Sequence, residues 1–142
     1  MRTHPTYLTP VEDANSSEVV TATNVITAAE SGKTFYLNSA TEFVSTLPAP
    51  LLGLKYKFIV KAAPASASYT VICAAAGTLI KGQILTNDFS GTVDSDFGTT
   101  GELTITFVDS KAVAGDWVQV ESDGTYWYAT GACSVFDAVT LS

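Results

Sequence analysis

The chain is short of the residues from which most active sites are built. It has one histidine, His4, and two cysteines among 142 residues. A serine or cysteine nucleophile needs a neighbouring base, most often a histidine, and His4 lies next to Pro5, outside any pattern of buried residues. Cys73 and Cys133 are 60 positions apart (133 − 73), whereas zinc sites and disulfide frameworks use closer or more numerous cysteines. The sequence predicts no enzyme, no cofactor, no metal site and two small buried thiols.

Charge is also scarce. Asp, Glu, Lys and Arg make up 15% of the residues, against about 25% in an average domain. Seven basic and fourteen acidic residues give a net charge of −7. Nucleic acids and anionic membranes attract a surplus of Lys and Arg, so neither is expected as a partner. The longest apolar run, residues 71–76, is far shorter than the roughly 20 residues that span a bilayer, and no signal-peptide pattern is visible.

What the chain has instead is a β composition, with twenty Thr, thirteen Ser and 46% hydrophobic residues. From residue 19 onward, short runs with a period of two alternate with turn residues, and no segment longer than one turn supports a helix. We expect an all-β fold, an antiparallel β-sandwich or barrel (jelly-roll-like) of about nine or ten short strands. Residues 86–101 are the longest expected loop, and 133–136 the last expected strand. No internal repeat is visible, so a solenoid is not expected.

The first 18 residues differ from the rest, because no period of 2 or 3.6 runs through them. Their sizeable apolar side chains are Tyr7, Leu8 and Val11. We expect residues 1–18 to be an extended N-terminal arm and residues 19–142 to be the sandwich domain. The arm is either a frayed terminus or a segment that anchors a partner through those three side chains.

Residues 117–128 carry the strongest local signal. Asp123-Gly124 between two alternating runs predicts a hairpin with a two-residue type I′ turn, in which Val120 pairs with Trp127. One face of the hairpin then reads as core: Val118, Val120, Trp127 and Ala129. The other face is aromatic but polar-tipped and is a candidate interface: Trp117, Gln119, Glu121, Tyr126 and Tyr128.

A second candidate surface lies on residues 55–61, where apolar and basic residues alternate cleanly. Lys55, Lys57 and Lys61 share the polar face of this expected strand. That stripe is either the solvated face of a half-buried strand or a docking face for an acidic partner, which includes another copy of this acidic chain.

Two groups of segments, taken together, resemble those of a known class of proteins. They comprise residues 28–37 (AAESGKTFYL), 46–50 (TLPAP), 53–58 (GLKYKF), 115–118 (GDWV) and 122–128 (SDGTYWY). Together they resemble β-modules of tailed-bacteriophage virion proteins, which include head decoration (cement) proteins and modules of some tail fibres. The resemblance covers most of residues 27–131.

The resemblance implies a non-enzymatic structural protein, often a homotrimer, that seats on the major capsid protein with its arm along the shell. The implied location is the capsid surface, after synthesis in the host cytoplasm. Chain length favours the capsid, because a fibre protein would usually add a shaft and an attachment domain. The alternative is a tail-fibre or receptor-binding module in which Trp117, Tyr126 and Tyr128 stack on host carbohydrate.

Overall fold

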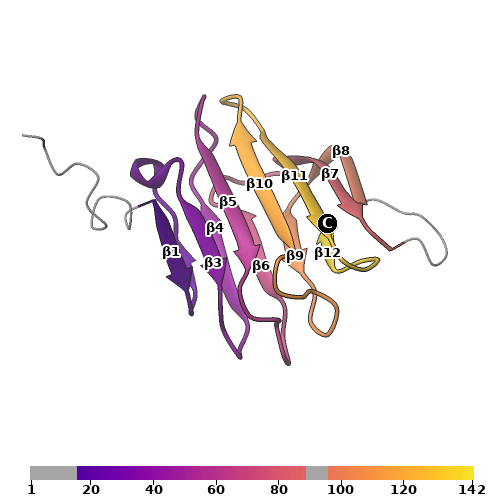
Figure 1. The fold of residues 1–142 in the computed structure, drawn as a ribbon. Helices are drawn as coiled ribbons and strands as arrows, with labels where there is room; N and C mark the ends of the chain where they lie inside the picture. The colour runs from indigo at the N-terminus through magenta and orange to yellow at the C-terminus, as the bar shows by residue number, and fades with distance from the viewer. Residues whose placement is uncertain (1–15, 89–95) are drawn as a thin grey trace, which may run out of the picture.

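Two β-sheets packed face to face form the fold (Figure 1). The computed structural model describes residues 16–88 and 96–142. One sheet has the strand order β1 (Ser17–Val20), β3 (Thr34–Leu37), β5 (Lys55–Val60), β10 (Trp117–Ser122), β11 (Trp127–Cys133), β7 (Ile80–Thr86) and β8 (Asp96–Glu102). The other has the order β12 (Val139–Leu141), β9 (Thr104–Phe107), β6 (Tyr69–Cys73), β4 (Phe43–Leu47) and β2 (Asn24–Val25). A 3₁₀ turn, η1 (Ala28–Glu30), lies between β2 and β3.

The expected all-β sandwich is confirmed, with twelve strands in the described part of the chain. The sheets are mixed rather than purely antiparallel, because five of the strand pairs are parallel. Residues 16–88 and 96–142 include no helix that is long and apolar enough to cross a membrane.

The first six strands wind as a coil between the two sheets. The chain alternates from one sheet to the other at every step, so that β1, β3 and β5 are parallel neighbours and so are β2, β4 and β6. Ser17 pairs with Thr34 and Thr34 with Lys57, so successive turns take 17 (34 − 17) and 23 (57 − 34) residues. This is a solenoid-like path, which the sequence did not predict. Turns of unequal length leave no fixed period to detect.

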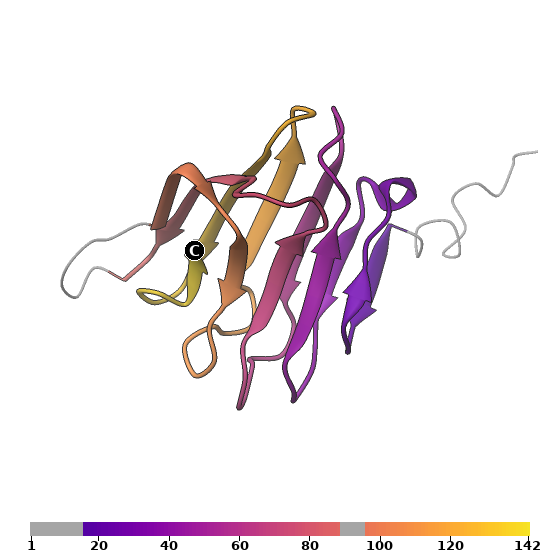
Figure 2. The same ribbon diagram turned by 180° about the vertical axis from the view of Figure 1, so that it is seen from behind.

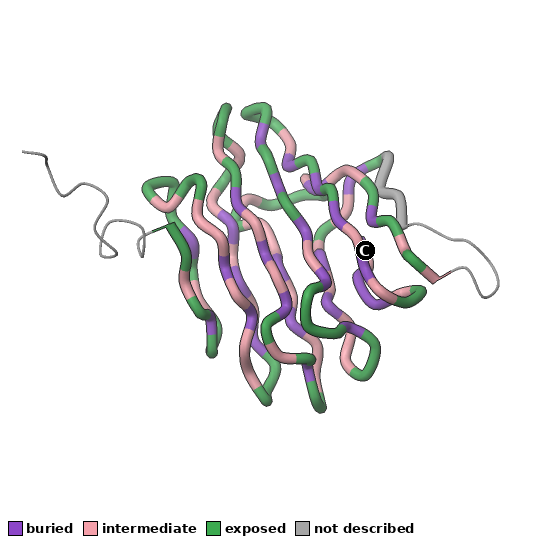
Figure 3. The backbone as a smooth tube through the Cα atoms, in the orientation of Figure 1, coloured by how far each residue is buried: buried purple, intermediate pink, exposed green. Residues whose placement is uncertain are grey.

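Buried residues alternate with more exposed ones along the strands of both sheets (Figure 3). The buried hydrophobic side chains form one core cluster. Phe35 stacks on Phe58 across the parallel β3–β5 pair with ring centroids 5.4 Å apart. Phe43 stacks on Tyr69 across β4 and β6 at 4.5 Å. All four rings are at most 1% exposed, and burying an aromatic side chain of this size contributes about 1.5–3 kcal/mol.

The hairpin of β10 and β11 has a different register from the predicted one. Val120 pairs with Ala129 rather than with Trp127, because the loop has four residues, 123–126. The Asp123 carboxylate accepts the backbone N–H groups of Thr125 and Tyr126, both at 2.8 Å, and so closes a wider turn. In that loop φ is positive at Gly124 alone, whereas a type I′ turn needs two such residues.

The register error is two residues, so the faces of the hairpin are unchanged. Side chains alternate with a period of two, and an even shift leaves each on its own side. Val118, Val120, Trp127 and Ala129 are buried as predicted. Tyr126 belongs to the loop rather than to β11, and its ring lies against Lys81, with Nζ 3.7 Å from the ring centre.

Three predicted boundaries also differ. The limit between arm and domain, after residue 18, falls inside β1, which pairs with β3. The expected loop over residues 86–101 contains most of β8, whose Gly98 pairs with Gly82 of β7. The last strand is β12 rather than residues 133–136. At the start of β1 and in β8, pairing with a distant strand extends the sheet through residues of modest β propensity.

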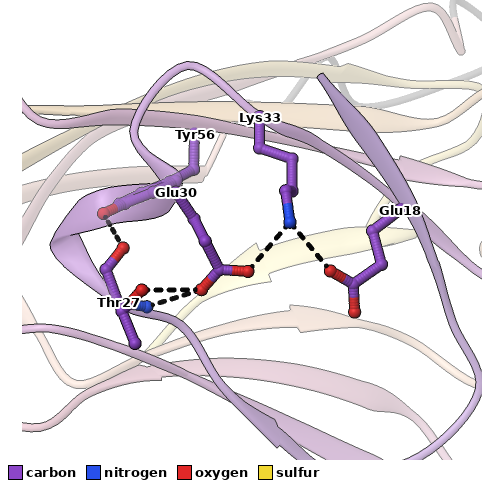
Figure 4. A network of polar contacts seen from close by, with 5 residues as sticks. All are labelled: Glu18, Thr27, Glu30, Lys33 and Tyr56. Carbon is purple, nitrogen blue, oxygen red and sulfur yellow. Dashed lines mark hydrogen bonds and ion pairs between the residues drawn. The ribbon is translucent and has the colours of Figure 1, made fainter. Parts of the chain in front are cut away.

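A polar network links residues of β1, η1 and β5 (Figure 4). The Glu30 carboxylate accepts the backbone N–H of Thr27 at 2.8 Å, as the glutamate of a capping box does. Lys33 Nζ lies 3.0 Å from Glu30 and 3.1 Å from Glu18. The Tyr56 hydroxyl donates to the Thr27 carbonyl oxygen at 2.9 Å. The edge strand β1 is thereby tied to η1 and to β5.

The network favours the charged forms of its two central groups. Burial by itself raises the pKa of Glu30, but the hydrogen bonds from Thr27 and Lys33 more than offset this and hold that pKa below its usual value. The bond to Glu30 raises the pKa of Lys33. The Glu30 contribution to stability is therefore present above the unfolded carboxyl pKa and is lost as pH falls through the folded value. The Lys33 contribution is lost only as pH rises through its raised folded value.

Replacing Lys33 with methionine should lower the free energy of unfolding by about 1 kcal/mol at pH 7, the upper range for partly exposed ion pairs. The difference from wild type should shrink as pH falls through the lowered folded pKa of Glu30, because protonation removes the charge that Lys33 contacts. Urea unfolding at pH 7 and pH 3 measures both values. Lys111→Met is the control, because the Lys111–Asp137 pair is long (3.7 Å) and exposed. Equal losses in the two variants would contradict the prediction.

Candidate interaction face

The outer surface of the seven-stranded sheet gathers most of the residues that the sequence singled out. Strand registers place side chains from six strands on it in rows. We call this surface the lysine face. Its outward residues are Ser17, Val19, Thr34, Tyr36, Lys55, Lys57, Ile59, Lys81, Gln83, Leu85, Trp117, Gln119, Glu121, Tyr128, Thr130 and Ala132.

The antiparallel pairing of β5 with β10 joins the two candidate surfaces of the sequence. Lys57 lies opposite Gln119, and Lys55 lies opposite Glu121. The lysine stripe and the aromatic side of the hairpin are therefore neighbours on one sheet. Lys61 follows β5 and lines a shallow hollow at the margin of this face, together with Val19.

Lys81 is a member of the face that the sequence did not indicate. The parallel pairing of β7 with β11 places Lys81 opposite Tyr128. The two residues are 47 positions apart (128 − 81), and no local pattern links them. With Lys55 and Lys57 against Glu121, the strand residues of this face carry 3 − 1 = +2 charges, and Lys61 adds one more at its margin, within a chain of net charge −7.

Two of the aromatic rings have an ammonium group above them. Lys57 Nζ lies 4.8 Å from the centre of the Trp117 ring, and Lys81 Nζ lies 3.7 Å from the centre of the Tyr126 ring. Such cation–π contacts contribute about 0.5–1 kcal/mol at exposed sites. They also hold the lysine side chains against the sheet, which lowers the entropy they lose when a partner binds.

Near the tip of the hairpin, Tyr128 places an aromatic ring with a hydroxyl group at one edge of the lysine face. Tyr128 is 45% exposed, and its hydroxyl donates to Asp123 at 3.1 Å. Backbone N–H groups, first that of Tyr126, lower the pKa of Asp123, and the bond to Asp123 raises the pKa of Tyr128. Both oxygens of Asp123 are thus engaged within the hairpin. Leu52 from the β4–β5 loop lines a hollow with them and is 81% exposed.

A buried carboxylate positions the start of β10 and hence Trp117. Asp116 is 4% exposed. It accepts the backbone N–H of Val113 at 3.0 Å and that of Ser134 at 2.8 Å. This residue ties the turn before β10 to the end of β11. It accounts structurally for the aspartate of the GDWV segment.

The remaining predicted residues lie away from the face or outside the described part of the chain. Tyr7, Leu8 and Val11 are outside the described residues. Cys133 is buried and Cys73 is partly exposed; they are free thiols in different sheets, and burial raises the pKa of Cys133. Within residues 16–88 and 96–142, no three His, Cys, Asp or Glu side chains form a group that could hold a metal ion.

Chemically, the lysine face offers ammonium groups, amides and hydroxyls, and Thr34, Lys55, Lys57 and Gln119 line a hollow within it. Ammonium groups on a surface attract acidic groups. Comparison with known proteins gives no further assignment: no family model, no curated protein and no solved structure matches this chain.

Proposed function

We propose that this protein is a non-enzymatic structural protein of a phage virion, a capsid decoration (cement) protein that binds the major capsid protein as a homotrimer. The observation that carries the proposal is the lysine face. The lysine stripe and the aromatic hairpin, chosen independently from the sequence, share one sheet surface. That surface is positive within an acidic chain. The proposed partner surface on the shell is therefore acidic.

The physical demands on a cement protein agree with this surface. Such a protein stabilises a shell because it binds the assembled state and so adds its binding free energy to the contacts that it bridges. It needs a broad contact area and needs no pocket. Interfaces of this kind favour Tyr, Trp and few uncompensated charges. Lysines that face an acidic partner also speed its encounter and fix its orientation.

The sugar-binding alternative has less support. A sugar ring stacks on an open aromatic face, but ammonium groups lie over Trp117 and Tyr126. Tyr128 lies opposite Glu121, whereas Trp117 lies opposite Ala132. Four residues of β10 separate the two rows, which corresponds to about 13 Å. These rings do not form one continuous platform.

The test uses phage shells that lack this protein and the purified wild-type chain. Replacing both Lys57 and Lys81 with glutamate reverses two charges on the lysine face. Shell binding measured by co-sedimentation should weaken at least about tenfold, which corresponds to 1.4 kcal/mol, and wild-type binding should weaken as salt rises.

Lys111→Glu is the matched control, because Lys111 is exposed and does not belong to the lysine face. It should bind shells as wild type does. Equal binding by the double variant and wild type would overturn the lysine face as the docking surface. Wild-type protein that ignores shells but binds host glycans would favour the receptor-binding alternative.

A further inference from the structure

A hollow of about 170 Å³ opens on the lysine face over β3, β5 and β10. Figure 1 shows these three strands together, and in Figure 2 the five-stranded sheet lies in front of them. Pockets for whole small molecules have about 300–1,000 Å³, whereas one water needs about 10–15 Å³. The hollow therefore has room for part of a side chain rather than for a complete substrate. Its lining residues are Gly32, Thr34, Lys55, Tyr56, Lys57 and Gln119.

Strand register and one glycine explain why the surface is hollow here. Thr34, Lys57 and Gln119 form one row across β3, β5 and β10. In the neighbouring row Lys55 lies beside Gly32, whose backbone N–H donates to the Lys55 carbonyl oxygen at 2.7 Å. A Cβ added to Gly32 would meet no atom within 4 Å. The missing side chain thus leaves the space beside Lys55 open.

The side chains around this space are rich in hydrogen-bond donors. Lys55 and Lys57 are two positions apart on one strand, so their ammonium groups project from the same face. Each ammonium has three donors and no acceptor. The Gln119 amide supplies two further donors, and the Thr34 hydroxyl supplies one. A ligand that accepts several hydrogen bonds and carries a negative charge matches this set.

The two lysines of the hollow are not neutralised within residues 16–88 and 96–142, because the ion pairs of that part of the chain lie elsewhere. Glu121 lies opposite Lys55 in the strand register, but the two side chains form no ion pair there. Lys57 Nζ lies 4.8 Å from the centre of the Trp117 ring, which holds the ammonium group and leaves its charge uncompensated. An anion between the two lysines would be attracted by both.

We propose that the hollow binds one carboxylate of the partner, an Asp or Glu side chain that enters between Lys55 and Lys57. The proposal rests on the proposed function, because it names the group that an acidic shell surface presents to the lysine face. An ionised carboxylate offers about four acceptor positions. It therefore accepts hydrogen bonds from both ammonium groups and from the Gln119 amide together. Such charge-assisted bonds are shorter and stronger than neutral ones.

The position of the hollow in the sheet supports a specific contact. β3, β5 and β10 are interior strands of the seven-stranded sheet, and side chains on strands are held more precisely than side chains on loops. The contact between Lys57 and Trp117 also reduces the side-chain entropy that binding would cost. Lys81 is on β7, which β11 separates from β10. It adds to the general attraction of the face but does not line the hollow.

An isosteric pair of substitutions separates this site from general attraction. Gln119→Glu places a carboxylate opposite Lys57, where it competes with the incoming one. Gln83→Glu makes the same change on β7, elsewhere on the lysine face, and both glutamines are exposed. In co-sedimentation with shells that lack this protein, Gln119→Glu should weaken binding at least about tenfold more than Gln83→Glu does. Equal losses would overturn the proposal.

A second measurement uses the wild-type chain without shells, so it depends on no variant that could misfold. The probe is sodium butyrate, a monocarboxylate with the chain length of a glutamate side chain. In NMR titrations, the side-chain amide resonances of Gln119 should shift saturably with butyrate, and those of Gln83 should not. Sodium chloride at equal ionic strength is the control. Equal shifts at the two amides, or a response to inorganic phosphate without one to butyrate, would contradict a carboxylate site.

The two measurements distinguish failure of this proposal from failure of the proposed function. A saturable Gln119 shift in a wild-type protein that ignores shells refutes the proposed function and leaves the carboxylate site. Shell binding that is weakened by the Lys57 and Lys81 double variant, but equally in the two glutamine variants, refutes the hollow alone.

Discussion

Replacing Trp127 with alanine should destabilise the protein by about 3–5 kcal/mol, the range for large aromatic side chains removed from cores. Trp127 is fully buried and packs against Tyr56 with ring centroids 5.7 Å apart. It comes from β11, an interior strand of the seven-stranded sheet between β10 and β7, where few neighbours can move to fill the space. A single domain has about 5–15 kcal/mol in total, so the yield of folded protein should also fall sharply.

Two further variants separate core packing from surface contact. Trp127→Phe should cost much less than Trp127→Ala, because it keeps a ring and removes an indole nitrogen, Nε1, that is buried without a hydrogen-bond partner among the described residues. Tyr128→Ala should leave the unfolding midpoint nearly unchanged, because Tyr128 points outward. Urea unfolding of the three variants provides the comparison. A tolerated Trp127→Ala together with an unfolded Tyr128→Ala would mean that the faces of β11 are reversed.

Replacing Gly82 with alanine should destabilise the protein by about 3 kcal/mol or more, because two costs add. Gly82 has a φ of +135°, which strains any residue with a side chain by about 1–3 kcal/mol. A Cβ there would also overlap the Ala129 carbonyl oxygen and lie 2.8 Å from the Ala129 nitrogen. Overpacking of this kind costs about another 1–3 kcal/mol. The change should force β7 away from β11 and displace Lys81 from the lysine face.

Gly53→Ala is the matched control for the backbone cost. Gly53 has a φ of +86°, and a Cβ added to it would have no other atom within 4 Å, so this position carries the strain without the overlap. The difference between the two free energies of unfolding, measured in urea, isolates the close approach of β7 and β11. Similar losses at Gly53 and Gly82 would show that the close approach is not rigid.

The bend at Gly82 can be located from the sequence, but its cause cannot. A glycine inside an alternating run predicts a bulge, and the β7–β8 register does shift between Ile80 and Gly82. The reason for glycine lies in β11, which approaches Gly82 from 47 positions further along the chain (129 − 82). A local pattern carries no information about such a neighbour.

In the β10–β11 hairpin, too, the local pattern was correct and the strand register was not. Asp123-Gly124 correctly predicted the place of the turn, and alternation correctly predicted that Trp127 is inside and Tyr128 outside. The loop length was wrong, because the Asp123 carboxylate captures two backbone N–H groups and widens the turn. The predicted burial of each side chain was still correct, because a register shift of two residues leaves every side chain on the same face of the sheet.

The sequence by itself thus determined the fold class, the inward side of most strands and the candidate residues of β5 and β10. These follow from composition and from a period of two, which are local properties of the chain. Only the tertiary structure decided which strands are neighbours. It joined Lys57 to Gln119, brought Lys81 beside Tyr128, and aligned Thr34 with Lys57. Strand order depends on packing between segments far apart in the sequence, so the lysine face becomes visible only once the chain has folded.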